Sequence, residues 1–251
     1  MLNLDGTEEE YLKYRHGYPP KLLERLKLYS IGIEKQHVLD IGTANGLFAR
    51  DLARQGCRVT GIDLSSDLIH QAQQVNIKDQ LPIEYLEGNV EHLPFKKSSF
   101  KVITAVYCWH WFNKSKVAEE VYRVLEDNGR LAIINYDWIP SRNYVALHTQ
   151  SLLEEFNPSA YIPNETKMFP EWVEDIYKAG FSDVETFSFD INIPYSIKNC
   201  IGRIQASPEV GGSLTKEEIS LFNYRLNTFL SEHTSTSFNI PYRAYGIIGI
   251  K

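Results

Sequence analysis

Short apolar runs rich in β-branched residues recur along the first half of the chain, and stretches with helically spaced apolar residues separate them. The runs predict buried strands, and the stretches predict amphipathic helices. We expect strands near residues 37–41, 58–62, 83–87, 100–106 and 130–135, and helices near 7–15, 20–29, 46–55, 66–75 and 115–125. Because strands and helices alternate, the pattern predicts an α/β fold with a parallel sheet and helices on both faces.

The second half of the chain has a less regular pattern. We expect helices over residues 141–157, 168–181 and 214–233, and strands over 182–195 and 240–250. The longest of these helices carries Thr215 and Glu218 near its start, at the spacing of a capping box.

The segment HVLDIGTANG, residues 37–46, joins a predicted strand to a glycine turn. Gly42 and Gly46 allow the backbone to turn tightly and leave room for a ligand to approach it. A predicted helix and a second strand follow, and that strand stops at Asp63. This order is typical of a nucleotide-binding βαβ unit, in which the terminal acid accepts hydrogen bonds from ribose hydroxyls.

The spacing of the glycines separates two classes of nucleotide site. A dinucleotide site requires G-x-G-x-x-G, which the sequence GTANG does not match. With Asp40 two residues before the first glycine, the segment resembles motif I of class I S-adenosylmethionine-dependent methyltransferases, D-x-G-x-G-x-G. Ala44 replaces the middle glycine. Its methyl group is tolerated if φ stays negative, so we expect a negative φ at Ala44.

Three further segments resemble the same family, in the same order. LEGNVEHLPF, residues 86–95, is similar to the segment after the family's third strand, with Asn89 in place of an acid that meets the adenine amino group. An Asn oxygen can still accept that hydrogen bond. The triplet HWF, residues 110–112, within an aromatic run over 107–112, resembles a subset of small-molecule enzymes that includes the trans-aconitate type. YLKYRHGYPP, residues 11–20, resembles the N-terminal motif of the same subset.

The resemblance implies a fold and a set of site residues. The expected fold is a single Rossmann-like methyltransferase domain over residues 1–251. It has a mostly parallel seven-stranded sheet, and an antiparallel last strand lies between the fifth and sixth strands. Its expected parts are N-terminal helices over 7–29, a cofactor-binding core over 36–135, and substrate-side lid segments over 139–168 and 196–238. The implied cofactor-binding residues are Tyr11, Arg15, Asp40, Gly42, Thr43, Ala44, Gly46, Asp63, Leu64, Asn89, Val90, Glu91, Val106 and Tyr107. The expected substrate-pocket residues are Trp109, His110, Trp111, Tyr136 and Trp138.

The expected chemistry is an in-line displacement of the cofactor's methyl group by a small-molecule acceptor. The protein must hold the acceptor atom in line with the sulfur, and such positioning can supply roughly 7–11 kcal/mol. A carboxylate acceptor needs no base at neutral pH, whereas a hydroxyl or an ammonium must lose a proton. His110 is the candidate general base.

Charge and cysteine content limit the kinds of binding partner that we expect for this chain. The net charge is −6 and no basic run is present, so nucleic acid and anionic membranes are not expected to bind. The three cysteines, Cys57, Cys108 and Cys200, are far apart, so the sequence predicts no metal site and is typical of a cytoplasmic protein. A monomer or a homodimer is expected.

Two other functions stay open from the sequence alone. A non-catalytic module that binds S-adenosylmethionine would carry the same motifs. An NAD-type oxidoreductase would also place an acid after the second strand, but its glycine spacing is missing.

Overall fold

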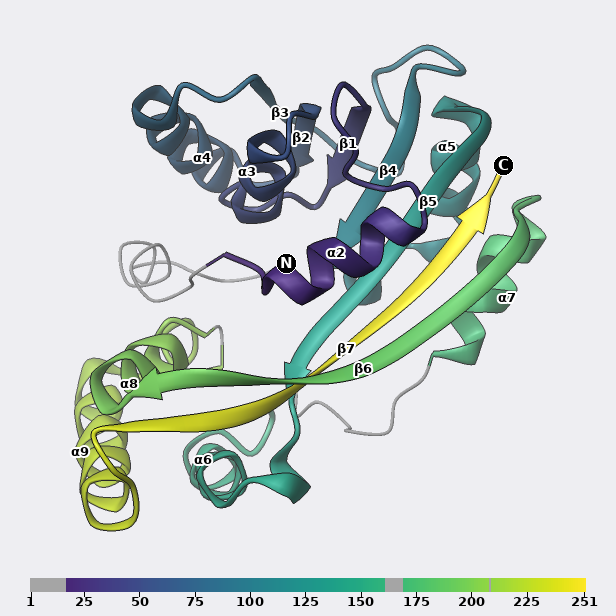
Figure 1. Cartoon of the computed structure of the whole chain (residues 1–251). Coiled ribbons are helices and arrows are strands. Elements are labelled where there is room, and N and C mark those ends of the chain that lie inside the picture. The colour runs from purple at the N-terminus through teal and green to yellow at the C-terminus, as the bar shows by residue number, and fades with distance from the viewer. Residues whose placement is uncertain (1–16, 161–168, 208) are drawn as a thin grey trace. The chain divides into compact units, whose positions relative to one another are not determined.

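Seven strands form one sheet, in the order β3-β2-β1-β4-β5-β7-β6, in the computed structural model, which describes residues 17–160, 169–207 and 209–251. The strands are β1 (His37–Ile41), β2 (Arg58–Asp63), β3 (Ile83–Glu87), β4 (Phe100–Val106), β5 (Leu125–Trp138), β6 (Ser182–Ser196) and β7 (Ser237–Ile250). The pairs β3–β2, β2–β1, β1–β4 and β4–β5 are parallel. Figure 1 shows β5, β7 and β6 side by side.

Strand β7 runs antiparallel to β5. The Lys251 amide donates to the Gly129 carbonyl, and the Asn128 amide donates to the Lys251 carbonyl, both at 3.0 Å. Just past the other end of β5, the Ile139 amide donates to the Pro241 carbonyl, so the partner's number falls as the residue number along β5 rises, as it does between antiparallel strands. The predicted fold class, with an antiparallel last strand between the fifth and sixth strands, is therefore confirmed.

The helices of the described residues are α2 (Pro20–Leu28), α3 (Leu47–Arg54), α4 (Ser66–Asp79), α5 (Lys114–Val124), α6 (Tyr144–Phe156), α7 (Pro170–Lys178), α8 (Ile197–Gln205) and α9 (Lys216–His233). Short 3₁₀ turns cover Trp109–Trp111 and Pro140–Arg142. The capping box at the start of α9 is confirmed, because Thr215 and Glu218 exchange hydrogen bonds between side chain and backbone. The predicted helix over 7–15 lies outside the described residues.

The chain divides into two compact units. Among the described residues, we call 17–135, 169–188 and 244–251 the core unit, and 136–160, 189–207 and 209–243 the second unit. The core unit holds all of β1 to β4, while β5, β6 and β7 contribute residues to both units. The expectation of a single domain with lid segments stays a prediction.

The core unit buries apolar side chains on both faces of its strands. Leu39 and Ile41 of β1 share a hydrophobic cluster with residues of α5 and α7. Alternate strand residues point to opposite faces. Val38 and Asp40 therefore point away from that cluster, and both are buried. Helix α3 packs against β2 and β3.

The second unit has its own hydrophobic cluster, formed by α6, α8, α9 and the ends of the long strands. Phe222, Leu226 and Leu230 lie on one face of α9 and are fully buried. Helix α8 is not among the helices predicted from the sequence. It has only nine residues, and Ser196 caps it by accepting the Asn199 amide, so its helical periodicity is too short to stand out.

Candidate functional site

The turn between β1 and α3 carries three residues with positive φ. They are Gly42 at 63°, Ala44 at 49° and Gly46 at 74°. The expectation of a negative φ at Ala44 is wrong. A left-handed conformation costs an L-residue roughly 1–2 kcal/mol. The Ala44 amide offsets part of this cost by donating to Asp63 Oδ2 at 2.8 Å.

Gly42 is required by the packing of the protein itself. A Cβ atom at Gly42 would lie 2.9 Å from the Cβ and Sγ atoms of Cys108, in the loop that follows β4. Its positive φ excludes most L-residues as well. The glycine was predicted to admit a ligand, and the structure adds that it lets the loops after β1 and β4 touch.

Asp40 joins the glycine turn to the sheet. Its carboxylate accepts the Thr43 hydroxyl at 2.7 Å and the Thr104 hydroxyl of β4 at 2.6 Å. Burial raises the pKa of Asp40 to about 6, and the two threonine bonds oppose this rise. Both carboxylate oxygens thus bond inside the protein, and Asp40 ties the glycine turn to β4.

Asp63 stands at the end of β2, half-buried beside the glycine turn. Its Oδ2 accepts the Ala44 amide and its Oδ1 accepts the Ser65 amide at 3.0 Å. A carboxylate can accept about four hydrogen bonds, which leaves capacity for a ribose diol. Leu64 follows directly and exposes 54% of its surface. The cofactor contacts assigned to Asp63 and Leu64 stay a prediction.

The segment after β3 forms a local turn. Asn89 is exposed, and its Oδ1 accepts the Glu91 amide at 2.9 Å. Glu91 also pairs with Lys116 at 3.4 Å. The Val90 side chain is buried in the hydrophobic cluster of the core unit, so only its backbone is left for a ligand. The adenine contacts assigned to these residues stay a prediction.

The loop after β4 begins with a strained tyrosine. Val106 is buried, and Tyr107 has a φ of 57°, which is unusual for a bulky residue. Its amide donates to the Ile134 carbonyl at 2.8 Å. The His110 ring lies 5.7 Å from the Tyr107 ring and 4.8 Å from the ring of Trp111, which is 51% exposed. Strain of this kind clusters at functional sites.

Trp109 was predicted to line the substrate pocket, and the structure corrects this. Its side chain is fully buried and belongs to the hydrophobic cluster of the core unit. The 3₁₀ turn over Trp109–Trp111 rotates consecutive side chains by about a third of a turn. It therefore directs Trp109 inward and leaves Trp111 exposed.

Tyr136 and Trp138 lie in the second unit. The Tyr136 ring stacks on Tyr242 at 4.8 Å, and the Arg203 guanidinium lies 5.8 Å from the centroid of the Trp138 ring. Their role in a substrate pocket stays a prediction. Tyr11 and Arg15 lie outside the described residues.

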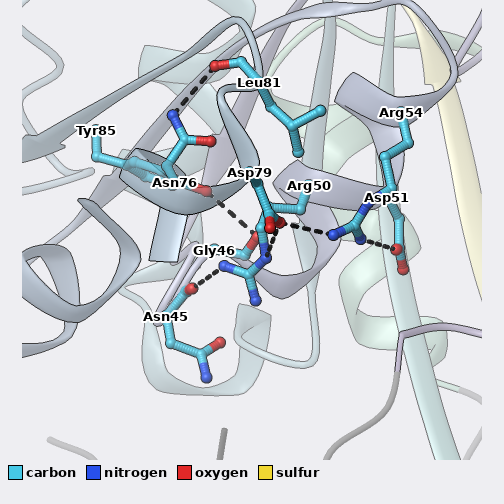
Figure 2. Close-up of polar contacts among 9 residues, drawn as sticks. All are labelled: Asn45, Gly46, Arg50, Asp51, Arg54, Asn76, Asp79, Leu81 and Tyr85. Atoms are coloured by element: carbon cyan, nitrogen blue, oxygen red, sulfur yellow. Dashed lines mark hydrogen bonds and ion pairs between the residues drawn. The ribbon is translucent and has the colours of Figure 1, made fainter. Parts of the chain in front are cut away.

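Sequence reasoning missed two residues behind the glycine turn. Arg50 of α3 is 4% exposed, and its Nη1 donates to the Asn45 carbonyl at 2.6 Å (Figure 2). The Tyr85 hydroxyl of β3 donates to the Gly46 carbonyl at 3.4 Å. The sequence does indicate burial of Arg50, because this arginine lies between the apolar residues Ala49 and Leu52, on the buried side of a short helix.

Within the described ranges, no group of three or more His, Cys, Asp or Glu side chains could hold a metal ion. The same ranges contain no helix long and apolar enough to cross a bilayer. Cys57, Cys108 and Cys200 are buried free thiols.

Comparisons with known proteins agree with this geometry. A family described as "Methyltransferase domain" matches residues 39–133. The demethylmenaquinone methyltransferase of Chlorobaculum tepidum is 31% identical over 184 residues, which cover 65% of this chain and 74% of that protein. The ubiquinone biosynthesis O-methyltransferase of Rickettsia typhi is 33% identical over 133 residues, which cover 53% of this chain and 54% of that protein.

A solved structure is similar over nearly the whole chain. Phosphoethanolamine N-methyltransferase 2 of Haemonchus contortus, in complex with S-adenosyl-L-methionine, has a TM-score of 0.61 and 18% identity. The match covers 98% of this chain and 57% of that chain. At this identity the likeness concerns the fold.

Proposed function

Because the chain belongs to the class I S-adenosylmethionine-dependent methyltransferases of the small-molecule type, we propose that it methylates an oxygen, nitrogen or carboxylate of a small-molecule acceptor by in-line displacement. Membership of this family supports an enzyme that uses this cofactor over an NAD-type oxidoreductase or a non-catalytic module. The relatives are named for quinone methylation and for phosphoethanolamine N-methylation. Their names support a small acceptor without deciding which atom receives the methyl group.

The observation that carries the proposal is the position of Asp63. Its carboxylate holds the glycine turn through the Ala44 amide and keeps hydrogen-bonding capacity for a ribose. The exposed Leu64 beside it offers an apolar surface to an adenine ring. Together they support binding of an adenosine moiety at the ends of β1 and β2, the edge where ligands bind in parallel sheets.

The chain's own residues would bind the cofactor, orient the acceptor and, where needed, remove a proton from the acceptor. When bound, S-adenosylmethionine supplies the methyl carbon and the sulfur leaving group. Asp63 and the glycine turn hold the adenosine end, while Trp111 offers an exposed aromatic surface beside His110. For a hydroxyl or ammonium acceptor, His110 would remove the proton. These residues all lie in the core unit.

The test of this function is cofactor binding by an Asp63 variant. The parent should bind S-adenosylhomocysteine and not NAD, and Asp63→Ala should weaken that binding by roughly ten- to a hundredfold, because a charged acceptor is lost. Asp67→Ala is the matched control, since Asp67 is exposed in the first turn of α4. Calorimetry that shows equal affinity for the parent and both variants would contradict the ribose assignment.

A further inference from the structure

A buried arginine lies behind the glycine turn and touches its backbone. We propose that Arg50, together with Tyr85, is a positioning residue that holds the turn over residues 42–46 in the shape that binds the cofactor. This inference rests on the proposed function and extends it to residues that have no place in motif I. Neither side chain needs to touch the cofactor.

The guanidinium of Arg50 is held from two sides. Its Nη1 donates to the Asn45 carbonyl at 2.6 Å, and its Nε lies 3.9 Å from the Asp79 carboxylate at the end of α4. The Arg50 side chain is only 5% exposed. A buried cation is costly unless it is paired and hydrogen-bonded. The Arg50 side chain is therefore confined to this position, and it confines the Asn45 carbonyl with it.

Tyr85 holds the next carbonyl of the turn. Its hydroxyl donates to Gly46, and a Cβ atom at Gly46 would overlap that hydroxyl. Burial raises the pKa of Tyr85 to about 12, so the hydroxyl keeps its proton and remains a donor at neutral pH. Figure 2 shows Arg50 and Tyr85 converging on the backbone at Asn45 and Gly46.

A glycine in β2 makes room for this arrangement. A Cβ atom at Gly61 would lie 2.9 Å from side-chain atoms of both Thr43 and Tyr85. The turn thus rests on β2 and β3 while Arg50 anchors its end. Because a trans peptide directs its N–H away from its C=O, fixing the carbonyls of Asn45 and Gly46 also fixes the directions of the next two amides.

Arg54 provides a matched control one helical turn away. It binds the same Asp79 carboxylate at 2.7 Å and also pairs with Asp51, but its side chain is 52% exposed (Figure 2). None of its hydrogen bonds among the described residues reaches the glycine turn. Arg54→Met thus removes a cation from the same network without releasing a carbonyl of the turn.

The first measurement is titration of S-adenosylhomocysteine by calorimetry. Arg50→Met should raise the dissociation constant about tenfold or more, because hydrogen bonds from a charged group are lost, and each folded molecule should still bind one ligand. Arg54→Met should bind like the parent. A merely structural role would instead lower the number of binding sites while leaving the dissociation constant unchanged, and that result would overturn the inference.

Two additional readouts keep the inference testable if Arg50→Met folds poorly or if the parent binds no ligand. Tyr85→Phe removes one hydroxyl and should raise the dissociation constant in the same direction, by a smaller factor. Hydrogen exchange of the ligand-free proteins should be faster at the amides of residues 46 and 47, which share peptides with the anchored carbonyls, in Arg50→Met and in Tyr85→Phe than in Arg54→Met. Unchanged exchange at these amides would overturn the inference. If the two variants exchange faster but the parent does not bind S-adenosylhomocysteine, the proposed function is overturned and the positioning of the turn by Arg50 and Tyr85 stands.

Discussion

Asp40 is a carboxylic acid that the fold removes from water. Burial raises its pKa from 3.8 to about 6. The folded state therefore holds the proton more tightly than the unfolded chain. Its contribution to the free energy of unfolding is fully present below about pH 4 and is lost as the pH rises through about 6. This contribution is on the order of 3 kcal/mol.

The prediction is that Asp40→Asn removes this pH dependence. An Asn side chain can accept one threonine hydroxyl and donate to the other, so Thr43 and Thr104 keep a partner. At pH 7 the variant should be at least as stable as the parent, and its stability should fall less between pH 4 and pH 6. Urea unfolding at several pH values measures this. Equal slopes for variant and parent would contradict the assignment of the titration to Asp40.

His110 lies beside Tyr107 and Trp111. Its substitution shows whether methyl transfer to a given acceptor needs a general base. With a hydroxyl or ammonium acceptor, His110→Ala should lower kcat by about 10²- to 10⁴-fold. Binding of S-adenosylhomocysteine should not change. His70→Ala, an exposed substitution in α4, is the control. An unchanged kcat with such an acceptor would show that His110 is only an aromatic packing partner.

At the scale of elements, the start of helix α9 was predicted correctly from a local sequence motif, the capping box. Thr215 and Glu218 satisfy each other's backbone amides at its first turn. Thr215→Ala should lower the free energy of unfolding by about 1 kcal/mol, because the helix loses its N-cap acceptor. Thr228→Ala, exposed later in the same helix, should be neutral or stabilising, since Ala is the better helix former. Thermal unfolding compares the two variants, and equal midpoints would contradict the capping assignment.

The elements of the core unit also followed from sequence. The strands β1, β3 and β4 have the predicted bounds because their apolar runs end at glycine, proline or polar residues. Strand β5 is longer than predicted at both ends: Leu125 pairs with Phe100 of β4 in the core unit, and residues 136–138 lie in the second unit. Strand β7 gains residues 237–239 in the second unit, where the Ile139 amide donates to the Pro241 carbonyl. Such pairing depends on a partner about a hundred residues away along the chain, which no local pattern encodes.

At the scale of the whole molecule, most of the residues predicted to bind the cofactor lie in one compact unit. Asp40, the glycine turn, Asp63 and the loop after β4 all belong to the core unit. The net charge of −6 disfavours association with polyanions, in keeping with a small acceptor. The second unit carries an aromatic cluster that includes the hydrogen-bonded pair Tyr195 and Tyr242.

The sequence by itself determined the α/β order and the positions of Asp40, Gly42, Gly46 and Asp63, while the antiparallel last strand was expected only from the resemblance to the methyltransferase family. The order and the positions could be predicted because strand periodicity, glycine turns and acids at strand ends are each encoded in a short stretch of sequence. The resemblance to the methyltransferase family added the cofactor to these positions.

Only the tertiary structure decided which way individual side chains and peptides point. It turned Trp109 inward, gave Ala44 a positive φ and placed Arg50 and Tyr85 behind the glycine turn. These outcomes depend on contacts between segments distant in sequence, such as Gly46 with Tyr85 of β3 and Gly42 with Cys108 after β4. The physical reason is that a buried polar group takes its partner from whatever the packed fold brings within hydrogen-bonding distance, and that distance is set by the sheet and not by the local pattern.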